Sequence, residues 1–362
     1  MTLNFSPIQE ELKKAIQDKV IPCASLLIAK DGHVLFETSD GLAQIEPPRV
    51  FSVQNYFDIA SLTKPVATAT LMMLAIQEKL CTLTQKMTHF FASKIQSQIT
   101  IAELLNHTSG LPDWQPFYQN LSKTADKDRK PELIKQILDC TPKTGEEAQC
   151  VYSDLGYMLL GFILETIYKQ DLATLFHEKI AKPFGLHHTF FAPLNQNKVS
   201  KNNFVATENC LWRHKLLVGE VMDDNAWTLN GVAGHAGLFS TAQDIHMWLS
   251  EMRLAKLGQS LIIQKNIFDL FTQIPKNRSM SERYFTYGFD TPSIPSSSGH
   301  YFSDNSIGHL GYTGTSFWWD FDRDIWIILL TNRVHPDRHN EAIKKFRPNM
   351  HDKIMKILIP EL

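Results

Sequence analysis

The chain has 362 residues, 43% of them hydrophobic and 20% charged, so it can build a sizeable core, and its composition excludes collagen, coiled coil and general disorder. Its 36 basic and 38 acidic residues give a formal net charge of −2 without a block of like charges, which argues against nucleic-acid binding. Five scattered cysteines, an odd number without a Cys-x-x-Cys pair, favour reduced thiols in a cytoplasmic protein over a disulfide framework.

The N-terminal residues lack the basic start and apolar run of a secretory signal. The most apolar helical stretch, residues 65–76, is shorter than the roughly 20 residues that cross a bilayer. We therefore expect a soluble cytoplasmic protein without a membrane span. The oligomeric state is unknown at this stage.

Both ends of the chain predict strands and helices in alternation. Residues 4–20 repeat apolar side chains every four positions, which predicts an amphipathic helix. Two strand-like runs, 24–30 and 33–38, flank an Asp-Gly pair, a strong hairpin signal. Near the other end, 316–321 and 325–331 predict a second hairpin, and a helix is expected over 350–358.

The middle of the chain favours helices separated by polar connectors, with predicted helices at 65–80, 101–105, 131–138, 155–168 and 172–180. Strand-rich ends around this middle predict an α/β (α+β) fold, in which terminal helices flank one antiparallel sheet. We expect residues 1–75 and 235–362 to form an α/β sandwich domain, with 76–234 as an inserted, mostly helical domain. The active cleft should lie between the two.

Ser61 and Lys64 form the only Ser-x-x-Lys spacing that we find in the chain, at a predicted boundary between an extended run and a helix. Residues three apart share a helix face, so the lysine can approach the serine hydroxyl. A desolvated lysine can lose its proton near neutral pH and act as the base toward the serine. The alternative is a helix-capping serine beside an unrelated surface lysine, which the motif alone does not exclude.

Two later phrases add to this motif. Tyr152, Ser153 and Asp154 precede an apolar helix, where Ser153 or Asp154 could simply act as its cap. His309 and Gly311 precede an apolar strand, and the glycine would let a substrate approach the backbone closely. Taken alone, each phrase has a structural explanation.

In this order, the three phrases resemble the penicillin-recognising serine enzymes, which carry Ser-x-x-Lys, a second motif and Lys-Thr-Gly. The chain is similar to the branch with tyrosine in the second motif: class C β-lactamases, D-alanyl-D-alanine carboxypeptidases, D-aminopeptidases and β-lactamase-like esterases. Further phrases at 103–112, 219–227 and 231–244 are similar to the same family, so the resemblance covers about residues 24–336.

The resemblance implies a role for each matching residue. Ser61 would be the acylated nucleophile, Lys64 its lysine partner, and Tyr152 the phenol that exchanges protons with the serine and the leaving group. The backbone N–H groups of Ser61 and Tyr312 would form the oxyanion hole. Asp154 takes the place of an asparagine that often contacts the substrate amide.

His309, Leu310 and Gly311 replace the Lys-Thr-Gly triplet and, with Asp154, would bind substrate. A histidine is cationic only part of the time near neutral pH, and Asp154 adds an acceptor-only anion. We expect both changes to weaken a pocket for an anionic ligand and to leave little or no β-lactamase activity.

Other candidates are weaker. His235 could line the cleft or belong to a structural turn, and Asp113 with Trp114 could form the cleft rim. His107 is expected near the end of a helix that stops at Gly110. No metal site is predicted, because the second histidine of a zinc-protease motif is missing from the segment 177–181.

The sequence thus predicts a serine hydrolase that needs no cofactor and cleaves a small ester, amide or peptide through a Ser61 acyl-enzyme. Two alternatives stay open. One is a D-alanyl-D-alanine carboxypeptidase, penicillin-binding protein or D-aminopeptidase with the same residues, and the other is a non-catalytic binding protein that kept the fold.

Overall fold

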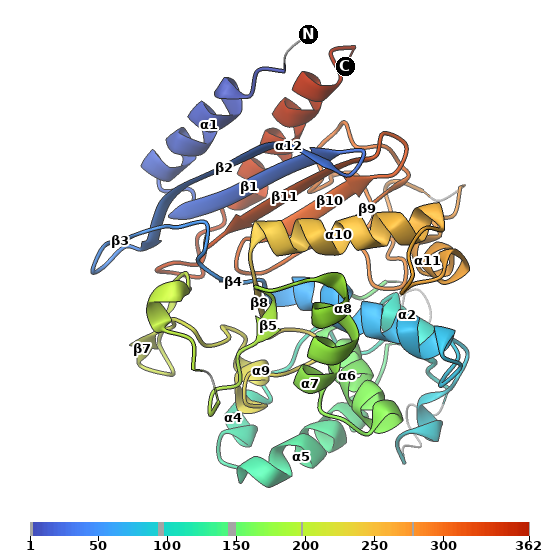
Figure 1. Cartoon of the computed structure of the whole chain (residues 1–362). Coiled ribbons are helices and arrows are strands. Elements are labelled where there is room, and N and C mark those ends of the chain that lie inside the picture. Colours follow the sequence, from blue (N-terminus) through green and yellow to red (C-terminus); the bar gives the residue numbers. More distant parts are fainter. Residues whose placement is uncertain (1–2, 93–97, 144–149, 197, 277–278, 362) are drawn as a thin grey trace.

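A six-stranded antiparallel sheet joins the two ends of the chain in the computed structural model, which describes residues 3–92, 98–143, 150–196, 198–276 and 279–361. The strand order is β3-β2-β1-β11-β10-β9. The strands are β1 (Cys23–Lys30), β2 (His33–Gln44), β3 (Arg49–Val50), β9 (Ser306–Leu310), β10 (Ser316–Asp320) and β11 (Ile325–Thr331). β1 and β11 pair at the centre, from Ala24 opposite Thr331 to Lys30 opposite Ile325. The predicted antiparallel sheet built from both termini is confirmed (Figure 1).

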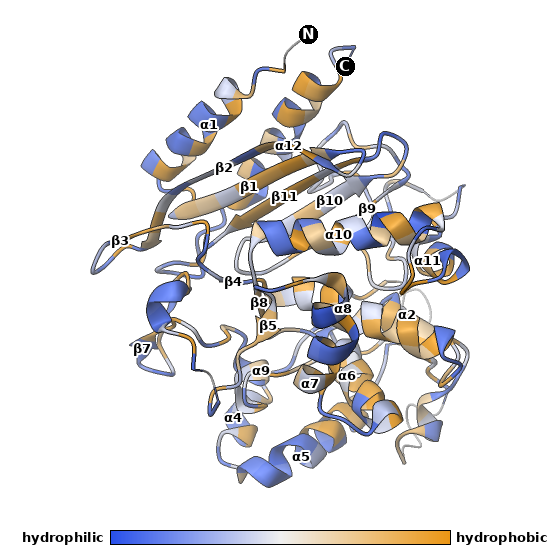
Figure 2. Ribbon diagram, in the orientation of Figure 1, coloured by the Kyte–Doolittle hydropathy of each residue, from blue (hydrophilic) through white to orange (hydrophobic). Residues whose placement is uncertain are grey.

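Helices cover both faces of this sheet (Figure 1). Alternate residues of β1 point to opposite faces: Leu26 packs in the cluster beneath α1 (Ser6–Gln17) and α12 (Ile343–Leu358), whereas Leu27 belongs to the larger core under α10 (Ala242–Leu257). Figure 2 shows the strands coloured mainly as hydrophobic where these helices cover them. The flanking terminal helices are therefore as predicted.

The remaining helices lie mostly in the middle of the chain and pack below α10 in Figure 1. They are η1 (Ala60–Leu62), η2 (Lys64–Ala69), α2 (Thr70–Gln77), η3 (Met87–His89), α3 (Ile101–Leu105), α4 (Tyr118–Leu121), α5 (Asp126–Leu138), α6 (Asp154–Tyr168), α7 (Leu172–Phe176), η5 (His177–Ala181), α8 (Lys182–Phe184), η6 (Lys201–Asn203), α9 (Asp224–Thr228) and α11 (Lys265–Thr272).

Short strands connect this helical region to the strand before the Ser-x-x-Lys motif. β4 (Phe57–Asp58) and β5 (Phe190–Phe191) both pair with β8 (Leu238–Ser240), and β6 (Asn209–Cys210) pairs with β7 (Lys215–Leu216). Because β5 from the middle shares a sheet with β4, the two regions are in close contact there. The proposed division at residues 75 and 235 stays a prediction.

Among the helices that differ from their predicted extents are the one predicted at 65–80 and the C-terminal helix. The predicted helix at 65–80 begins with a π-helical segment, η2, and continues as α2. The C-terminal helix begins at Ile343 and includes Pro348, a residue that normally marks the first turn of a helix and so concealed the earlier start. Within the described ranges, every helix is too short or too polar to span a bilayer.

Candidate active site

Ser61 lies in a tight turn between a strand and a helix. β4 ends at Asp58, η1 contains Ser61, and η2 follows. Ala60 has a φ of 47°, a left-handed conformation that costs a non-glycine residue about 1 kcal/mol or more. The Ser61 side chain makes no capping hydrogen bond at either helix. The alternative reading of Ser61 as a cap is therefore wrong, and its hydroxyl faces Lys64 instead.

Two hydrogen bonds join the turn after β9 to the turn that carries Ser61. Thr313 Oγ1 donates to the carbonyl oxygen of Asp58 at 2.7 Å, and Thr315 Oγ1 donates to that of Ile59 at 3.0 Å. Both hydroxyls are buried, so the bonds are shielded from water. These two contacts place the end of β9 beside Ser61.

Gly311 allows this close approach. A Cβ at Gly311 would lie 2.0 Å from Thr315 Oγ1 and 2.5 Å from the carbonyl oxygen of Ile59, so no other residue fits without displacing the turn. Tyr312 follows directly and borders the same two cavities as Ser61. This proximity is what a shared oxyanion hole of the Ser61 and Tyr312 N–H groups would require.

Lys64 is fully buried and donates to three oxygens. Its Nζ lies 2.6 Å from Asp154 Oδ1, 3.0 Å from Ser61 Oγ and 3.3 Å from the carbonyl oxygen of His235. The two motifs are therefore joined by an ion pair between Lys64 and Asp154. Sequence reasoning placed Asp154 against the substrate and did not anticipate this pair.

The charge of Lys64 follows from these neighbours. Burial alone lowers the pKa of Lys64, but the Asp154 carboxylate and Tyr152 together raise it above that of an ordinary lysine. The neutral lysine that the sequence allowed as a base is thus not favoured in this resting arrangement, where the partners of Lys64 stabilise its charged form. Lys64 is an ammonium beside the nucleophile.

Tyr152 lies immediately before α6. Ser153 is the cap of this helix, since its Oγ accepts the Gly156 N–H at 3.2 Å. Burial raises the pKa of the Tyr152 phenol, and the charge of the nearby Lys64 only partly offsets this shift. Lys64 Nζ also lies 4.8 Å from the centre of the Tyr152 ring. The structure thus brings the hydroxyl, the amine and the phenol together.

His107 packs against the Tyr152 ring. Sequence reasoning placed His107 near a helix end and gave it no role in the site. The predicted helix over this segment ends at Leu105, not at Gly110, and His107 adopts a left-handed φ of 61°. Its Nδ1 accepts the Ser153 N–H at 2.9 Å, and its ring lies 4.5 Å from that of Tyr152. Burial holds the pKa of His107 well below its usual range, so the ring is a neutral acceptor.

His309 lies on β9 with its ring 5.9 Å from that of Tyr152. Its Nδ1 lies 2.9 Å from the carbonyl oxygen of Leu310. Burial, and then the nearby Lys64 ammonium, lower the pKa of His309 to about 3. The expectation of a partly cationic histidine is therefore wrong, because His309 is neutral across the physiological range.

Two cavities meet at Ser61, Tyr152 and Tyr312. The first has a volume of about 390 Å³, and its walls are otherwise mainly acidic or apolar. They include Ala60, Trp114, Asp154, Met222, Asp223, Asp224, Ala236 and Arg338. Trp114 is 42% exposed at this wall, so the predicted rim role holds for Trp114.

The second cavity, of about 260 Å³, is rich in basic side chains. Arg283, Arg333, Lys344 and Arg347 line it together with His309, Gly311 and a single carboxylate, Asp290. The predicted weakness toward anions is thus not supported by the charges around the site. Arginines from distant segments supply the positive charge that His309 lacks, and no motif identified them.

His235 lies behind the cleft, not in its wall. It is 1% exposed, and its Nε2 lies 2.9 Å from Asp223 Oδ1. Ligand atoms of Asp154, Asp223 and His235 lie within 4.8 Å of one another, as in a metal site. However, the Lys64 ammonium binds Asp154 in this group, and its charge would oppose a cation there.

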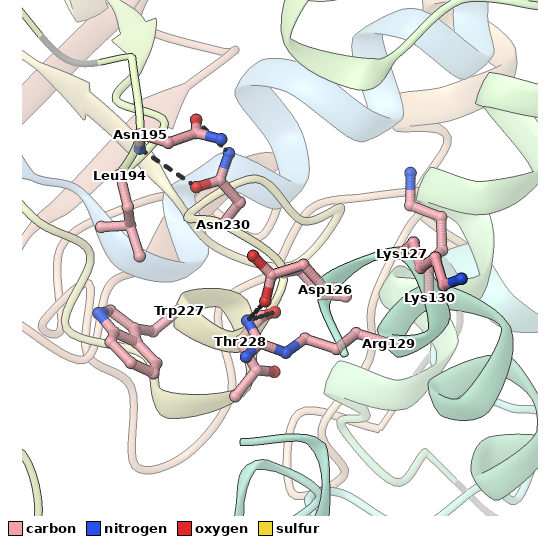
Figure 3. A pocket seen from close by; sticks show the side chains of 10 residues that line it. Asp126, Lys127, Arg129, Lys130, Leu194, Asn195, Trp227, Thr228 and Asn230 are labelled. Carbon is pink, nitrogen blue, oxygen red and sulfur yellow. Dashed lines mark hydrogen bonds and ion pairs between the residues drawn. The ribbon is translucent and has the colours of Figure 1, made fainter. Parts of the chain in front are cut away.

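A separate cavity of about 650 Å³ lies between α5 and the segments of Asn195 and Asn230 (Figure 3). Arg129 pairs with Asp126 at 2.9 Å, and Asn230 Nδ2 donates to Asn195 Oδ1 at 2.8 Å. None of the predicted site residues lines it. Because its polar groups largely satisfy one another, we assign no chemistry to this cavity.

Comparisons with known proteins agree with this arrangement. The family model described as Beta-lactamase matches residues 8–347. The chain is 31% identical over 352 residues to "N-acetylmuramyl-L-alanine amidase" of Bacillus subtilis (strain 168), covering 87% of this chain and 78% of that protein. It is 27% identical to a "Putative D-alanyl-D-alanine carboxypeptidase" of Salmonella typhi, covering 92% and 83%.

Solved structures share the fold at low sequence identity. A penicillin-binding protein homologue from Pyrococcus abyssi, described as octameric, has a TM-score of 0.74 at 17% identity, covering 99% of this chain and 78% of that one. EstCE1, described as a hydrolase with promiscuous acyltransferase activity, has a TM-score of 0.73 at 18% identity, covering 94% and 97%.

Proposed function

This chain belongs to the beta-lactamase family and is a serine hydrolase, and we propose that it cleaves an ester or amide bond through an acyl-enzyme on Ser61. The observation that carries the proposal is the buried contact of 3.0 Å between Lys64 Nζ and Ser61 Oγ, with the Tyr152 ring centre 4.8 Å from the same Nζ. A nucleophile within reach of its proton-transfer partners is the signature of covalent catalysis.

In the proposed reaction, Ser61 Oγ attacks the substrate carbonyl carbon as its proton passes to the pair of Lys64 and Tyr152. The oxyanion accepts hydrogen bonds from the backbone N–H groups of Ser61 and Tyr312. The proton then goes to the leaving group as its bond to the carbonyl carbon breaks. Water attacks the acyl-enzyme, which releases the acid and restores the Ser61 hydroxyl, so the cycle needs no cofactor.

The basic second cavity favours one alternative among the substrates. Relatives of this chain are named as an amidase and as a carboxypeptidase. A carboxylate on the substrate would find Arg283, Arg333 and Arg347 beside Ser61. This supports a D-alanyl-D-alanine carboxypeptidase as the second candidate function. Little or no β-lactamase activity remains our expectation, because Asp154 replaces the asparagine of the family motif.

The location also remains a proposal. We propose a cytoplasmic protein, and the support is that all five cysteines are free thiols, with Cys23, Cys81 and Cys210 buried. Small-molecule substrates are favoured by the modest volumes of the two cavities beside Ser61.

The first prediction concerns Ser61→Ala. This variant should lose turnover of every ester, D-peptide and β-lactam that the wild type cleaves, and it should no longer react with a fluorophosphonate probe. Loss of the hydroxyl removes the only atom that can form the acyl bond. Ser122→Ala, at an exposed serine away from both cavities, should label and turn over as the wild type does. Equal labelling of Ser61→Ala would refute the assignment.

A fluorescent penicillin then separates the candidates. Stable labelling of the wild type, lost in Ser61→Ala, favours the carboxypeptidase. Rapid turnover of p-nitrophenyl esters without stable labelling favours the esterase. If no activated ester, penicillin or fluorophosphonate acylates Ser61, the non-catalytic binding protein is the better reading.

A further inference from the structure

Asp58 is a buried carboxylate that bonds to two separate segments of the chain. It lies at the end of β4, before the turn that carries Ser61, and is 3% exposed. Its Oδ1 accepts the Ala60 N–H at 2.9 Å, and its Oδ2 accepts the Met222 N–H at 2.7 Å. The carboxylate thus links the Ser61 turn to the loop 219–223, although Met222 lies 164 residues further along the chain.

Both segments form part of the cavity in which a substrate would meet the nucleophile. Ala60, Ser61 and Met222 line the first cavity together. Ala60 has the unfavourable left-handed φ of 47°, and the bond from its N–H to the Asp58 carboxylate helps to hold this conformation. The Asp58 carbonyl oxygen adds a third link, because it accepts from Thr313 in the turn after β9. Asp58 itself lines neither cavity, so it acts on a substrate only through these neighbours.

The two side-chain bonds of Asp58 require its ionised form. A carboxylate has two acceptor oxygens, whereas a carboxylic acid carries a hydroxyl donor on one of them. Each oxygen of Asp58 faces an N–H donor, so protonation would set a donor against a donor and break one of the two bonds. An asparagine has the same shape and the same conflict, because its amide nitrogen is a donor. Asp58→Asn therefore mimics the protonated state at every pH.

The surroundings of Asp58 bring its loss of charge close to neutral pH. Burial raises the pKa of Asp58 to about 6, although the two backbone N–H bonds lower it, and the charges of Asp223 and Arg213 act in opposite directions. Asp58 can therefore take up a proton under mildly acidic conditions while the protein is folded. The titratable groups on the elements packed around it include Lys64, Arg213, Glu220, Asp223, His235 and Tyr312.

We propose that Asp58 is a positioning residue whose ionised carboxylate assembles the site by holding the Ser61 turn against the loop of Met222. The inference rests on the function proposed above and goes beyond it, because it makes turnover depend on a group that touches no substrate. When Asp58 takes up a proton from solvent, one of its two N–H bonds breaks. The turn and the loop are then no longer held together, and acylation of Ser61 slows.

The kinetic test compares the pH dependence of kcat in the wild type and in Asp58→Asn between pH 5 and pH 8. In the wild type, kcat should fall below about pH 6, where Asp58 becomes protonated. In Asp58→Asn, kcat should be lower by about tenfold or more over the whole range and should lack this acidic limb, because one bond is always broken. Circular dichroism at each pH verifies that the protein is folded.

Asp244→Asn is the matched control. Asp244 is another buried carboxylate with a pKa that burial raises, and it accepts the His188 N–H at 2.7 Å, but it lines neither cavity beside Ser61. This variant should keep the wild-type kcat and the acidic limb even where it is less stable. Loss of a buried carboxylate in general would affect both variants alike, and that result would overturn the proposal.

A second measurement needs neither turnover nor a variant. In ¹⁵N-labelled protein, the backbone amide proton signals of Ala60 and Met222 should shift with a common midpoint near pH 6, as the carboxylate that they bond to becomes protonated. Amide signals that do not change between pH 5 and pH 8 would refute the proposal, and so would an acidic limb that persists in Asp58→Asn.

Two further outcomes are also decisive. If Asp58→Asn does not fold, the wild-type amide midpoint is compared with the wild-type acidic limb, and a difference of more than about one pH unit contradicts the proposal. If Ser61 is not acylated at any pH, the proposed function fails. The amide signals still show in that case whether the charge of Asp58 holds the turn and the loop together.

Discussion

Arg347 is buried without an acidic partner. It is 5% exposed, its Nε has no hydrogen-bond partner, and it makes no ion pair among the residues that the structure describes. Burial, and then Arg333, lower its pKa to about 10, so it is still charged at pH 7. An unpaired buried charge destabilises a protein. Arg347 lines the same cavity as Ser61, so we infer that it is retained to bind a carboxylate of the substrate.

We therefore expect Arg347→Met to bind substrate less well and to fold more stably. KM should rise about tenfold or more for substrates that carry a carboxylate and stay unchanged for neutral esters, since one charge-assisted bond is worth about 1.5–3 kcal/mol. Urea unfolding should show a larger free energy of unfolding. Lys344→Met, at an exposed cation on the same cavity, is the control and should alter stability little. A loss of stability in Arg347→Met would contradict this account.

At this scale the sequence revealed the residues that a short motif carries. Ser61 and Lys64 stand in a motif with characteristic spacing, and the resemblance of its phrase to the family indicated Tyr152. The positions of Arg347 and His107 depend on packing between distant segments, so no local pattern indicated them. The charge states of Lys64 and His309 were not predictable for the same reason: burial and the partner Asp154 determine them.

Between elements, α6 packs closely against the loop before β8 near the site. A Cβ at Gly234 would lie 2.2 Å from the Tyr157 carbonyl oxygen and 2.9 Å from the Gly161 amide nitrogen. Thr68 Oγ1 donates to the Gly234 carbonyl at 2.6 Å, which ties η2 to the same loop. The loop carries His235, whose carbonyl oxygen accepts from Lys64, so this packing positions the ammonium.

Gly234→Ala should accordingly lower the free energy of unfolding by about 1–3 kcal/mol and reduce turnover, because backbone must move to admit the methyl group. Gly156→Ala, on α6, is the matched control. Its Cβ would make only ordinary contacts, at 3.5 Å or more, and alanine favours a helix by about 1 kcal/mol. Chemical denaturation of both variants checks the contrast, and equal stabilities would refute it.

Elements were predictable where the signal was local. Both hairpins have their turn residues between two apolar runs, and the structure confirms them. The start of α12 could not be predicted, because Pro348 lies inside that helix. The π-helical turn of η2 could not be predicted either, because its conformation depends on the contacts of Lys64 and Thr68 with distant loops.

Across the whole molecule, three buried neutral histidines predict sensitivity to acid. Burial lowers the pKa of His309 and His351 to about 3 and that of His107 well below 6.5. The unfolded chain binds protons at these histidines below about pH 6.5. In the folded protein His309 and His351 bind them only near pH 3, and His107 only well below pH 6.5. Stability should therefore fall as the pH decreases through this window, by up to several kcal/mol per histidine.

Two buried carboxyls, Asp58 and Asp244, act in the opposite direction, because burial raises the pKa of both. Burial raises the pKa of Asp58 to about 6, so it favours the folded state below about pH 4 and loses that contribution as the pH rises to 6. His246 and His335 also have lowered pKa values, so the histidines outnumber the two carboxyls and the net effect should be acid unfolding. Urea titrations from pH 7 to pH 4 test this, and His351→Met should flatten the dependence. A free energy of unfolding that does not change over this range would contradict it.

The pairing of β1 with β11 has a consequence for biosynthesis. β1 leaves the ribosome about 300 residues before its partner, a delay of roughly 15–60 s at ordinary rates of translation. During that time β1 can pair only with β2, so its other backbone edge stays unpaired. Its apolar side chains, such as Leu27 and Ile28 on the two faces of the sheet, also lack the cover that they have in the folded protein. Truncated chains that stop before Ile325 should thus engage chaperones or aggregate, whereas the release of the last segment lets the central ladder close.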